Sequence, residues 1–570
     1  MTAQRTRVPV GISAMAIFLI SVPALFLRRA RKPAIRLPGV LRFRLPVPRL
    51  RRIRLATAWA VLAWAVGACT LFVVYLQVSR TSAVTSDGAS NALQAWDMLH
   101  GNLLLRGWQV SDVSFYTTEL PQYMLIEHWR GLTPDVVHIA SAMTYTLIAL
   151  LAGMLAKGRA TGREAVLRVM LAVGIMLAPQ PGNAIYVLMG SPDHMGSTVP
   201  VLLAFLLLDR APRRWYVPVA AGLVLCWGLI ADGIVLFTGI GPVVAVAAIR
   251  AYQSRFRLGQ RWLASWFELE LAATAAGAIW LARTALREIA AHGGFTVWPI
   301  STALTSAGDF PHYLTITSQG LLLLFGAYFF SMTVSFAAAL AMTHLAGLGL
   351  AAWGGCSAIR RFSRADLGAQ LLAAGIALTL AAYLLGTRAY DLLSTRDITA
   401  LLPFGAALAG RMLAGRLASA RLVPALAVVL VAYLISLGEV VVRPAAPQPT
   451  ARLAAWLSAH HLSYGLCDYW DANVTTLMTG GRVRLRSVSA NGMQVSRGSW
   501  EESASWYDPV RNAANFLVLA PDQPGSSFHT TVASVRRRFG QPVRIYELGT
   551  STILVWNQNL LTALAPAARP

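Results

Sequence analysis

Charged side chains are scarce in this sequence of 570 residues: Asp, Glu, Lys and Arg make up 13% of it, against 56% for hydrophobic residues. Ordinary soluble proteins contain about 25% charged and roughly 45–50% apolar residues. The mean hydropathy of +0.54 points the same way. This composition excludes a disordered chain, a fibrous protein and a purely soluble enzyme. It predicts a protein that crosses a membrane several times.

Cysteine is also rare, with four residues in the chain. Cys69, Cys226 and Cys356 lie in or beside apolar runs, and Cys467 lies in the polar C-terminal part. Their spacing contains neither a disulfide framework nor a cysteine metal motif. The sequence also lacks a Walker loop, a dinucleotide glycine motif, a His-Glu zinc motif and a Gly-x-Ser-x-Gly elbow. These absences argue against an ATP-driven pump and a serine hydrolase.

Acidic residues are few as well: 49 Lys and Arg stand against 25 Asp and Glu, which gives a formal net charge of +24. Nearly all basic residues are arginine, since lysine occurs only at Lys32 and Lys157. Such a balance is typical of nucleic-acid binding. Cytoplasmic loops of membrane proteins collect basic residues too, so the positions of the arginines distinguish the two interpretations.

Apolar runs near the length of a bilayer span, roughly 17–25 residues, predict eleven transmembrane helices. They lie near residues 57–77, 136–156, 166–183, 196–209, 216–231, 234–250, 267–285, 330–354, 367–386, 397–412 and 422–441. Stretch 317–329 is either an interfacial helix or part of the span that follows it.

Arginines concentrate in alternate loops of this arrangement, as the positive-inside rule demands. The pattern places residues 28–54 in the cytoplasm and the C-terminus outside, and nucleic acid is not an expected partner. The Arg- and Pro-rich tract 28–54 either lies on anionic lipid or only fixes the orientation. Before it, residues 9–27 form a further apolar run. This run is a twelfth span, an interfacial helix or an extension without function.

The character of the sequence changes after residue 441. Residues 442–450 read as a stiff linker, and residues 451–570 are long enough for a small core of their own. Helices are expected there at 450–460, from Asp471 to Gly480 and at 527–538, and strands at 464–468, 483–488, 516–519, 542–547 and 552–556. The chain is therefore predicted to comprise a basic segment (1–56), a multi-pass domain (57–441), a linker (442–450) and an extracytoplasmic α/β domain (451–570).

The longest outer loop before that domain spans residues 78–135. Apolar residues repeat with helical spacing over 88–99, which predicts an amphipathic helix that lies on the membrane surface and ends at His100. Asp87 stands at the start of this helix. It is either the N-cap, a position that Asp favours, or a general base at the boundary of water and lipid. The two roles are compatible.

Several features of this loop together carry a resemblance to a known family. The loop has Asp87-Gly88 just beyond the first span, then the juxtamembrane helix, then Gly101-Asn102, and Glu119-Leu120-Pro121 before the second span. This layout resembles the GT-C superfamily of integral membrane glycosyltransferases. It is most similar to the protein O-mannosyltransferase and aminoarabinose-transferase-like branch, glycosyltransferase family 39. That branch typically has Asp-Glu and a Lys-Pro-Pro-like segment, so this chain matches the Asp and lacks the second acid and the Lys.

The resemblance implies GT-C-like architecture and transfer of a sugar from a polyprenyl-phosphate donor to an acceptor hydroxyl, with Asp87 as general base. A departing phosphate needs cations, and the planar guanidinium of arginine suits it. The outer loops offer Arg396, Arg388 and His194 for the donor phosphate, and Asp97, Asp112, Tyr116, Glu119 and Gln122 for the acceptor or substrate. In this mechanism Asp87 and Arg396 should face one cavity.

Each candidate also has a structural interpretation. Arg396 could pair with Asp397, His194 could be a solvated loop residue, and Asp232 could cap a helix. The whole chain could be a non-catalytic membrane protein: a transporter of a lipid-linked substrate, a scaffold or a degenerate GT-C protein. No cofactor is certain, and a divalent cation stays open. The expected partners are the lipid bilayer, the polyprenyl-phosphate sugar and a glycan, lipid or protein acceptor, at the cell membrane.

Overall fold

The structure, a computed structural model, describes residues 49–190, 193–257, 265–300, 302–330, 332–492, 494–520 and 526–566. In these residues seven helices are long and apolar enough to cross a membrane. They are Val61–Arg80, Asp135–Lys157, Leu236–Phe256, Trp266–Ala291, Phe336–Arg360, Leu367–Leu385 and Val423–Val441. The predicted class, a multi-pass α-helical membrane protein, is confirmed.

Each of the eleven predicted spans coincides with helical structure. The helices are α2 (Arg49–Arg80), α5 (Asp135–Lys157), α6 (Gly162–Ile175), α8 (Thr198–Arg210), α9 (Tyr216–Ala231), η3 with α10 (Leu236–Ile240 and Gly241–Tyr252), α11 (Trp266–Ala291), α13 with α14 (Phe336–Thr343 and Leu345–Arg360), α15 (Leu367–Leu385), α16 (Leu401–Ser419) and α17 (Val423–Val441). Because α6, α8 and α9 are shorter than the roughly 20 residues of a full span, the number eleven stays a prediction.

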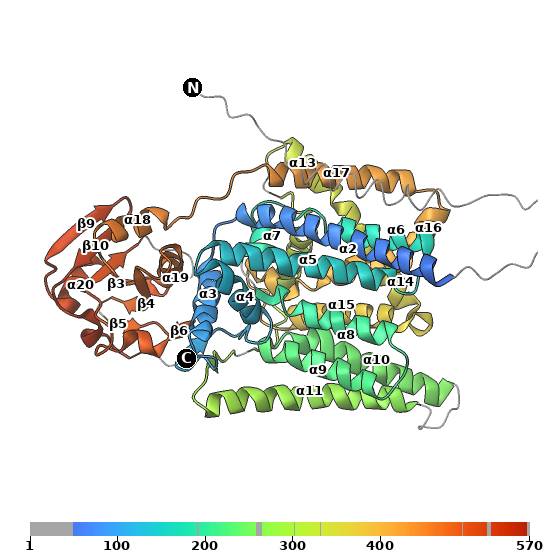
Figure 1. The fold of residues 1–570 in the computed structure, drawn as a ribbon, viewed down its shortest axis with the longest axis horizontal. Coiled ribbons are helices and arrows are strands. Elements are labelled where there is room, and N and C mark those ends of the chain that lie inside the picture. Colours follow the sequence, from blue (N-terminus) through green and yellow to red (C-terminus); the bar gives the residue numbers. More distant parts are fainter. Residues whose placement is uncertain are drawn as a thin grey trace, which may run out of the picture.

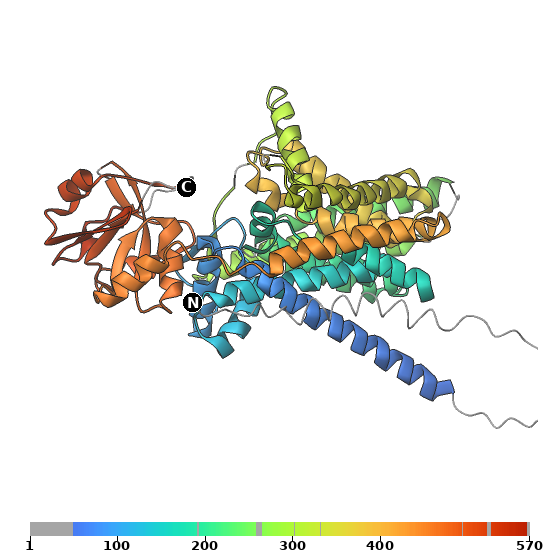
Figure 2. The same cartoon turned by 90° about the horizontal axis from the view of Figure 1, so that it is seen from above.

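The helices form one bundle, with the C-terminal region at one end of it (Figure 1). Helices α5, α8 and α14 end in Lys157, Arg210 and Arg360, at the end of the bundle that points away from the C-terminal region. Figure 2 shows that the first part of α2 diverges from its neighbours. Trp59 and Val61 on that part are exposed, as apolar side chains that face lipid are.

Close helix packing depends on small residues and one buried ion cluster. A Cβ atom on Gly410 of α16 would lie 2.4 Å from the carbonyl oxygen of Arg168 in α6, so only glycine fits there. Next to it, the buried guanidinium of Arg411 pairs with Asp209 of α8 and, at 2.9 Å, with Asp366 before α15. The Arg411 cluster therefore fastens three helices together at the arginine-rich end of the bundle.

Parts of the chain before and within the bundle differ from the prediction. Phe310–Leu324 forms a separate helix, α12, so stretch 317–329 is not part of the following span. That span is interrupted at His344, between α13 and α14. The apolar run 9–27 and most of the basic tract lie outside the described residues, and α2 begins inside the tract.

The first long loop contains two helices and a strand: α3 (Ser86–Leu99), β1 (Trp108–Val110) and α4 (Glu119–Arg130). The helix predicted at 88–99 is confirmed, and its predicted place on the membrane surface stays a prediction. α3 packs against α4, α5 and the C-terminal helix α19 (Tyr469–Met478), and most of its residues are buried. Helix α4 was not predicted; Pro121 lies in its first turn, where proline removes no helical hydrogen bond.

The C-terminal region has the predicted α/β character. Its elements are α18 (Ala451–Ala459), β3 (Tyr464–Cys467), α19, β4 (Arg484–Asn491), β5 (Gln494–Arg497), β6 (Glu502–Ser503), β7 (Phe516–Leu519), β8 (Phe528–His529), α20 (Val532–Phe539), β9 (Arg544–Leu548) and β10 (Ser551–Val555). The main sheet has the order β5-β4-β3-β7-β10-β9, with β8 beside β4. Two predicted details are wrong: Asp468, not Asp471, is the N-cap residue of α19, and residues 528–529 are strand.

A second, three-stranded sheet joins the C-terminal region to the bundle. Its order is β2-β1-β6, where β2 is Thr296–Val297. Strand β1 of the first loop pairs with β6 in antiparallel fashion, with Trp108 opposite Ser503. Backbone pairing and the contact between α3 and α19 hold the C-terminal region against the first loop.

Candidate active site

A cavity of about 440 Å³ lies where the first loop meets the C-terminal region. Its volume is in the range of small-ligand sites. Its walls mix carboxylates, a guanidinium, serine hydroxyls and indole rings. They are formed by Asp87, Asn91, Ser111, Asp112, Val113, Phe115, His194, Trp298 and Arg396 on one side, and by Tyr469, Trp470, Ser487, Ser489, Gly498, Ser499, Trp500, Glu501 and Ser527 on the other.

Asp87 lies in the first turn of α3 and is not its N-cap. The cap is Thr85, whose side chain accepts a hydrogen bond from the amide of Gly88 at 3.1 Å. The cap interpretation of Asp87 is therefore wrong. Because Thr85 satisfies the helix start, the carboxyl group of Asp87 is available for other contacts. It lines the cavity and accepts a hydrogen bond from the Tyr469 hydroxyl at 2.5 Å.

The same tyrosine hydroxyl contacts a second carboxyl group. Tyr469 Oη lies 2.6 Å from Glu501 Oε2, so the phenol stands between Asp87 and Glu501. Glu501 is 2% exposed and has a φ of +52°, a backbone conformation that residues other than glycine seldom adopt. Burial and the two carboxyl groups raise the pKa of Tyr469 well above its ordinary value, so the phenol keeps its proton.

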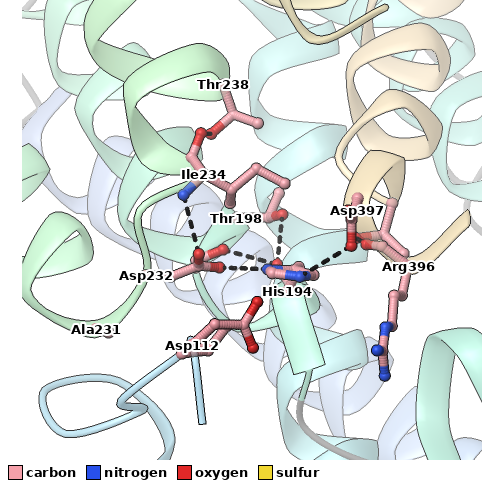
Figure 3. Close-up of polar contacts among 12 residues, drawn as sticks. Asp112, His194, Thr198, Ala231, Asp232, Ile234, Thr238, Arg396 and Asp397 are labelled. Atoms are coloured by element: carbon pink, nitrogen blue, oxygen red, sulfur yellow. Dashed lines mark hydrogen bonds and ion pairs between the residues drawn. The ribbon is translucent and has the colours of Figure 1, made fainter. Parts of the chain in front are cut away.

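Arg396 lines the cavity together with Asp87, as the proposed mechanism requires. It lies in the short helix η7 (Leu393–Ile398) before α16, and Figure 3 shows its side chain directed away from the carboxylate of Asp397. The predicted alternative, a pair between Arg396 and Asp397, is not what the structure has. Asp397 pairs with Arg388 at 2.9 Å and with His194 at 3.1 Å.

His194 is buried between two carboxylates, so its interpretation as a solvated loop residue is wrong (Figure 3). Its Nδ1 lies 2.8 Å from Asp232 and its Nε2 lies 3.1 Å from Asp397. Burial would lower the pKa of His194, but Asp232 and Asp397 raise it well above the ordinary value. Both ring nitrogens therefore carry hydrogen, and both are committed to carboxylates. His194 therefore lines the cavity and holds the carboxylates of Asp232 and Asp397 in place.

Two further candidates belong to this charged network. Arg388 is not among the residues that line the cavity; it donates to Asp397 and, at 3.3 Å, to Asp112. Although burial would raise it, His194 and Arg388 lower the pKa of Asp397 to about 2. Asp232, predicted as a helix cap, accepts from the amide of Ile234 at 2.9 Å and also pairs with His194.

Four predicted substrate residues do not line the cavity. Asp97 accepts hydrogen bonds from Asn102 and Trp108 and so closes the end of α3. Tyr116 donates to the carbonyl oxygen of Leu103 at 3.0 Å. Glu119 and Gln122 line a separate, mostly apolar cavity of about 490 Å³ that is formed by α2, α4, α5, α8 and α9. The sequence pattern predicted the correct loop for these residues, but they do not line the cavity.

The residues of the C-terminal half of the site were not among the predicted site residues. Tyr469 and Trp470 stand in an Asp-Tyr-Trp-Asp segment, and Trp500 and Glu501 in a Trp-Glu-Glu segment. The clustering of aromatic and acidic residues suits sugar binding, but packing was the stronger interpretation of it. Only the tertiary structure brings both segments to Asp87. In the described part of the chain, no group of three or more His, Cys, Asp or Glu side chains could hold a metal ion.

The fold and this cavity define a multi-pass membrane protein with a polar, ligand-sized cavity at the junction of the helical bundle and an α/β region. No family model and no curated protein matches the sequence. The solved structures to which the chain is similar include three different proteins. The first is the oligosaccharyltransferase of Archaeoglobus fulgidus with zinc and sulfate, at 14% identity over 79% of this chain and 67% of that one, with a TM-score of 0.43.

The second is ArnT from Cupriavidus metallidurans bound to undecaprenyl phosphate, at 15% identity over 90% of this chain and 100% of that one, with a TM-score of 0.38. The third is the arabinofuranosyltransferase AftD from Mycobacteria, at 16% identity over 87% of this chain and 40% of that one, with a TM-score of 0.37. All three are GT-C glycosyltransferases, the group that the first loop resembles. Identities and TM-scores this low do not place the chain in any of their families.

Proposed function

We propose that the protein is a membrane glycosyltransferase that moves a sugar from a polyprenyl-phosphate donor to an acceptor hydroxyl. The observation that carries this proposal is the presence of Asp87 and Arg396 in one polar cavity at the end of a membrane bundle. Asp87 accepts the proton of the acceptor hydroxyl, whose oxygen attacks the anomeric carbon. Arg396 binds the phosphate that leaves with the electron pair of the broken bond.

The surroundings of these two residues support a saccharide as the ligand. Trp298, Trp470 and Trp500 and several serines line the same cavity, and indole faces next to hydroxyl groups suit a sugar ring. The rings of Trp298 and Trp500 come from the bundle side and from the C-terminal region, with centroids 5.6 Å apart. The C-terminal region therefore closes the site and takes part in binding the acceptor.

The distribution of charge supports an outer-face site. Basic residues end α5, α8 and α14 at the opposite end of the bundle, and such residues favour the cytoplasm. In the proposal the basic N-terminal segment is cytoplasmic, and the cavity and the C-terminal region lie on the extracytoplasmic face of the cell membrane. The donor lipid then enters from the outer leaflet.

Substitution of Asp87 by Asn tests the proposed base. Membranes that contain the protein are supplied with a panel of polyprenyl-phosphate hexoses and pentoses carrying a radiolabel, and transfer to endogenous acceptors is measured. Asp87→Asn keeps the shape and can still accept from Tyr469, so the fold should persist. Transfer should fall by about 10²–10⁴-fold, the usual contribution of a general base.

Asp97→Asn is the matched control, because it makes the same change on the same helix away from the cavity. It should leave transfer near the wild-type rate. Arg396→Ala should weaken binding of polyprenyl monophosphate to the purified protein, measured by native mass spectrometry, and Arg396→Lys should restore part of it. Full transfer by Asp87→Asn would refute the proposed base. Polyprenyl phosphate binding without transfer in the wild type would instead favour a transporter or a scaffold.

A further inference from the structure

We infer that the acceptor is a neutral glycan of at least two sugar units. Its reacting unit meets Asp87, and the next unit binds to the C-terminal region on a surface that we call the serine–tryptophan wall: Ser487, Ser489, Trp500 and Ser527. The inference rests on the proposed function, because it names the acceptor of the proposed transfer. The observation that carries it is that this wall and Asp87 line one cavity.

The wall follows strand β4 away from the proposed base. Ser487 and Ser489 both lie on β4 and line the cavity, because residues two apart in a strand point to the same side. Ser487 is at the end near β6: its carbonyl oxygen lies 2.6 Å from Tyr507 Oη, which is 3.0 Å from Glu502. Ser489 lies about 6.6 Å further along the strand. The wall therefore continues over roughly the length of one sugar unit.

A pair of hydroxyl groups forms the far end of the wall. Ser489 Oγ lies 3.0 Å from Ser527 Oγ, and Ser489 is half-buried while Ser527 is exposed. Each hydroxyl has one hydrogen and two lone pairs, so the pair can donate to a ligand and accept from it. Sugar hydroxyls do both as well. A phosphate or carboxylate is better bound by arginine, and Arg396 lies on the bundle side of the cavity. The wall therefore suits a neutral ligand.

Indole rings stand beside these hydroxyl groups. Trp500 directly precedes Glu501, whose carboxylate contacts Tyr469 at 2.6 Å. The rings of Trp500 and Trp298 have centroids 5.6 Å apart and an interplanar angle of 66°, so they form a corner. Both rings are half-buried and line the cavity. The apolar face of a sugar ring can pack on an indole while its hydroxyl groups bond to the serines.

Glycine at position 498 is needed for the wall to keep its shape. The amide of Gly498 donates to the carbonyl oxygen of Ser487 at 3.0 Å. A Cβ atom on Gly498 would lie 2.1 Å from Ser487 Oγ, so any larger residue would push the hydroxyl of Ser487 from its place. The hydroxyl surface thus depends on a close backbone approach at this one position.

The backbone of the wall is already paired, which argues against an extended peptide as the ligand. Strand β4 pairs with β3, β5 and β8. On its other edge β5 bonds to Ala565, with N–O distances of 3.1 Å. A common mode of peptide binding adds a strand to an open sheet edge, and the described residues of β4 and β5 offer no such edge to the cavity. A saccharide, which binds through side chains, needs none.

Binding of saccharides to the purified full chain in detergent tests the inference. The probes are neutral methyl hexopyranosides and methyl pentofuranosides, each as the monosaccharide and as the corresponding disaccharide. Saturation-transfer difference NMR measures their affinities. At least one disaccharide should bind about 10-fold more tightly than its monosaccharide, because each added neutral hydrogen bond contributes about 2–10-fold. Equal affinities throughout, or no binding of any probe, would overturn the inference.

The double variant Ser489→Ala/Ser527→Ala removes the hydroxyl pair and leaves the strand backbone in place. It should lower the affinity for the preferred disaccharide about 10-fold and leave that for the monosaccharide unchanged. With the disaccharide as acceptor, KM should rise by the same factor and kcat should stay near the wild-type value, as for a contact that is equal in ground state and transition state. Equal losses for both saccharides would contradict the assignment.

Ser505→Ala is the matched control. Ser505 Oγ lies 2.8 Å from Ser503 Oγ, so this variant also breaks a contact between two serine hydroxyl groups, but neither residue lines the cavity. It should keep the preference for the disaccharide. A loss equal to that of the double variant would show a general effect on the C-terminal region and overturn the inference.

The binding measurement needs no transfer, so the inference and the proposed function can fail separately. If Asp87→Asn abolishes transfer but the wild type shows no preference for a disaccharide, the inference is wrong and the proposed function stands. If the preference exists and depends on Ser489 and Ser527 but the wild type transfers no sugar, the glycan site stands and the proposed function is wrong. Displacement of the disaccharide by its uronic acid analogue at lower concentration would refute a neutral ligand.

Discussion

The pairing of His194 with Asp232 and Asp397 should make His194→Leu one of the most destabilising substitutions near the site. His194 is 7% exposed, and its nitrogens lie 2.8 and 3.1 Å from the two carboxylates. Removal of one partner from a buried ion pair costs about 3–5 kcal/mol. Asp397 keeps Arg388 at 2.9 Å, whereas the contact left to Asp232 among the described residues is the amide of Ile234. We therefore expect the free energy of unfolding to fall by about 3 kcal/mol, the lower end of this range.

Unfolding by SDS titration in mixed micelles measures this loss. Asp232→Asn in the same chain removes the unpaired charge and keeps the acceptor for Ile234, so the double variant should recover much of the stability, as a double-mutant cycle detects. His292→Leu is the control, because His292 is exposed and its Nδ1 lies 3.9 Å from the Glu288 carboxylate and 2.8 Å from the carbonyl oxygen of that residue. It should change the unfolding free energy by less than about 0.5 kcal/mol.

The sign of the pH dependence provides a further test of the same pairing. Since Asp232 and Asp397 raise the pKa of His194 above its ordinary value of about 6.5, the stability contributed by His194 is fully present below that pH. It is lost as the pH rises through the raised value. His194→Leu should lack this alkaline loss. A variant as stable as the wild type, or a wild type that loses this stability on the acid side instead, would refute the argument.

Two further predictions concern the bundle. Gly410→Ala forces a Cβ atom to 2.4 Å from the Arg168 carbonyl oxygen and should cost about 1–3 kcal/mol, as overpacking does. A Cβ atom on Gly415 of the same helix would meet no atom closer than 3.9 Å, so Gly415→Ala should raise the free energy of unfolding by about 0.5–1 kcal/mol. Equal changes in the two variants on unfolding in SDS would contradict this prediction. Arg411→Met leaves the buried Asp209 carboxylate without its guanidinium and should cost about 3–5 kcal/mol. Arg411→Met with Asp209→Leu should recover much of the loss in the same assay, and no recovery would show that the charge is not the cause.

Membrane helices and local elements could be read from the sequence because they depend on neighbouring residues. About 20 apolar residues specify a span wherever they occur, and each of the eleven predicted spans contains helix in the structure. Helix α3 and the C-terminal strands β3, β7, β9 and β10 were predicted in the same way, from the local spacing of their apolar residues. Errors arose where tertiary contacts compete with local pattern. The apolar residues of α3 were read as a face toward the membrane, but they pack against α4, α5 and α19.

The two halves of the site show most clearly which features the sequence predicts and which depend on tertiary contacts. Asp87 and Arg396 could be proposed from sequence, since an acid after the first span and an arginine in an outer loop are local features. The contact of Asp87 with Tyr469 joins residues 382 positions apart, and no local pattern encodes such a contact. The same holds for His194, whose chain neighbours give no sign of Asp232 and Asp397. The type and the position of each residue in the sequence indicated which groups could react. The folding of distant segments against one another decides which of these groups meet.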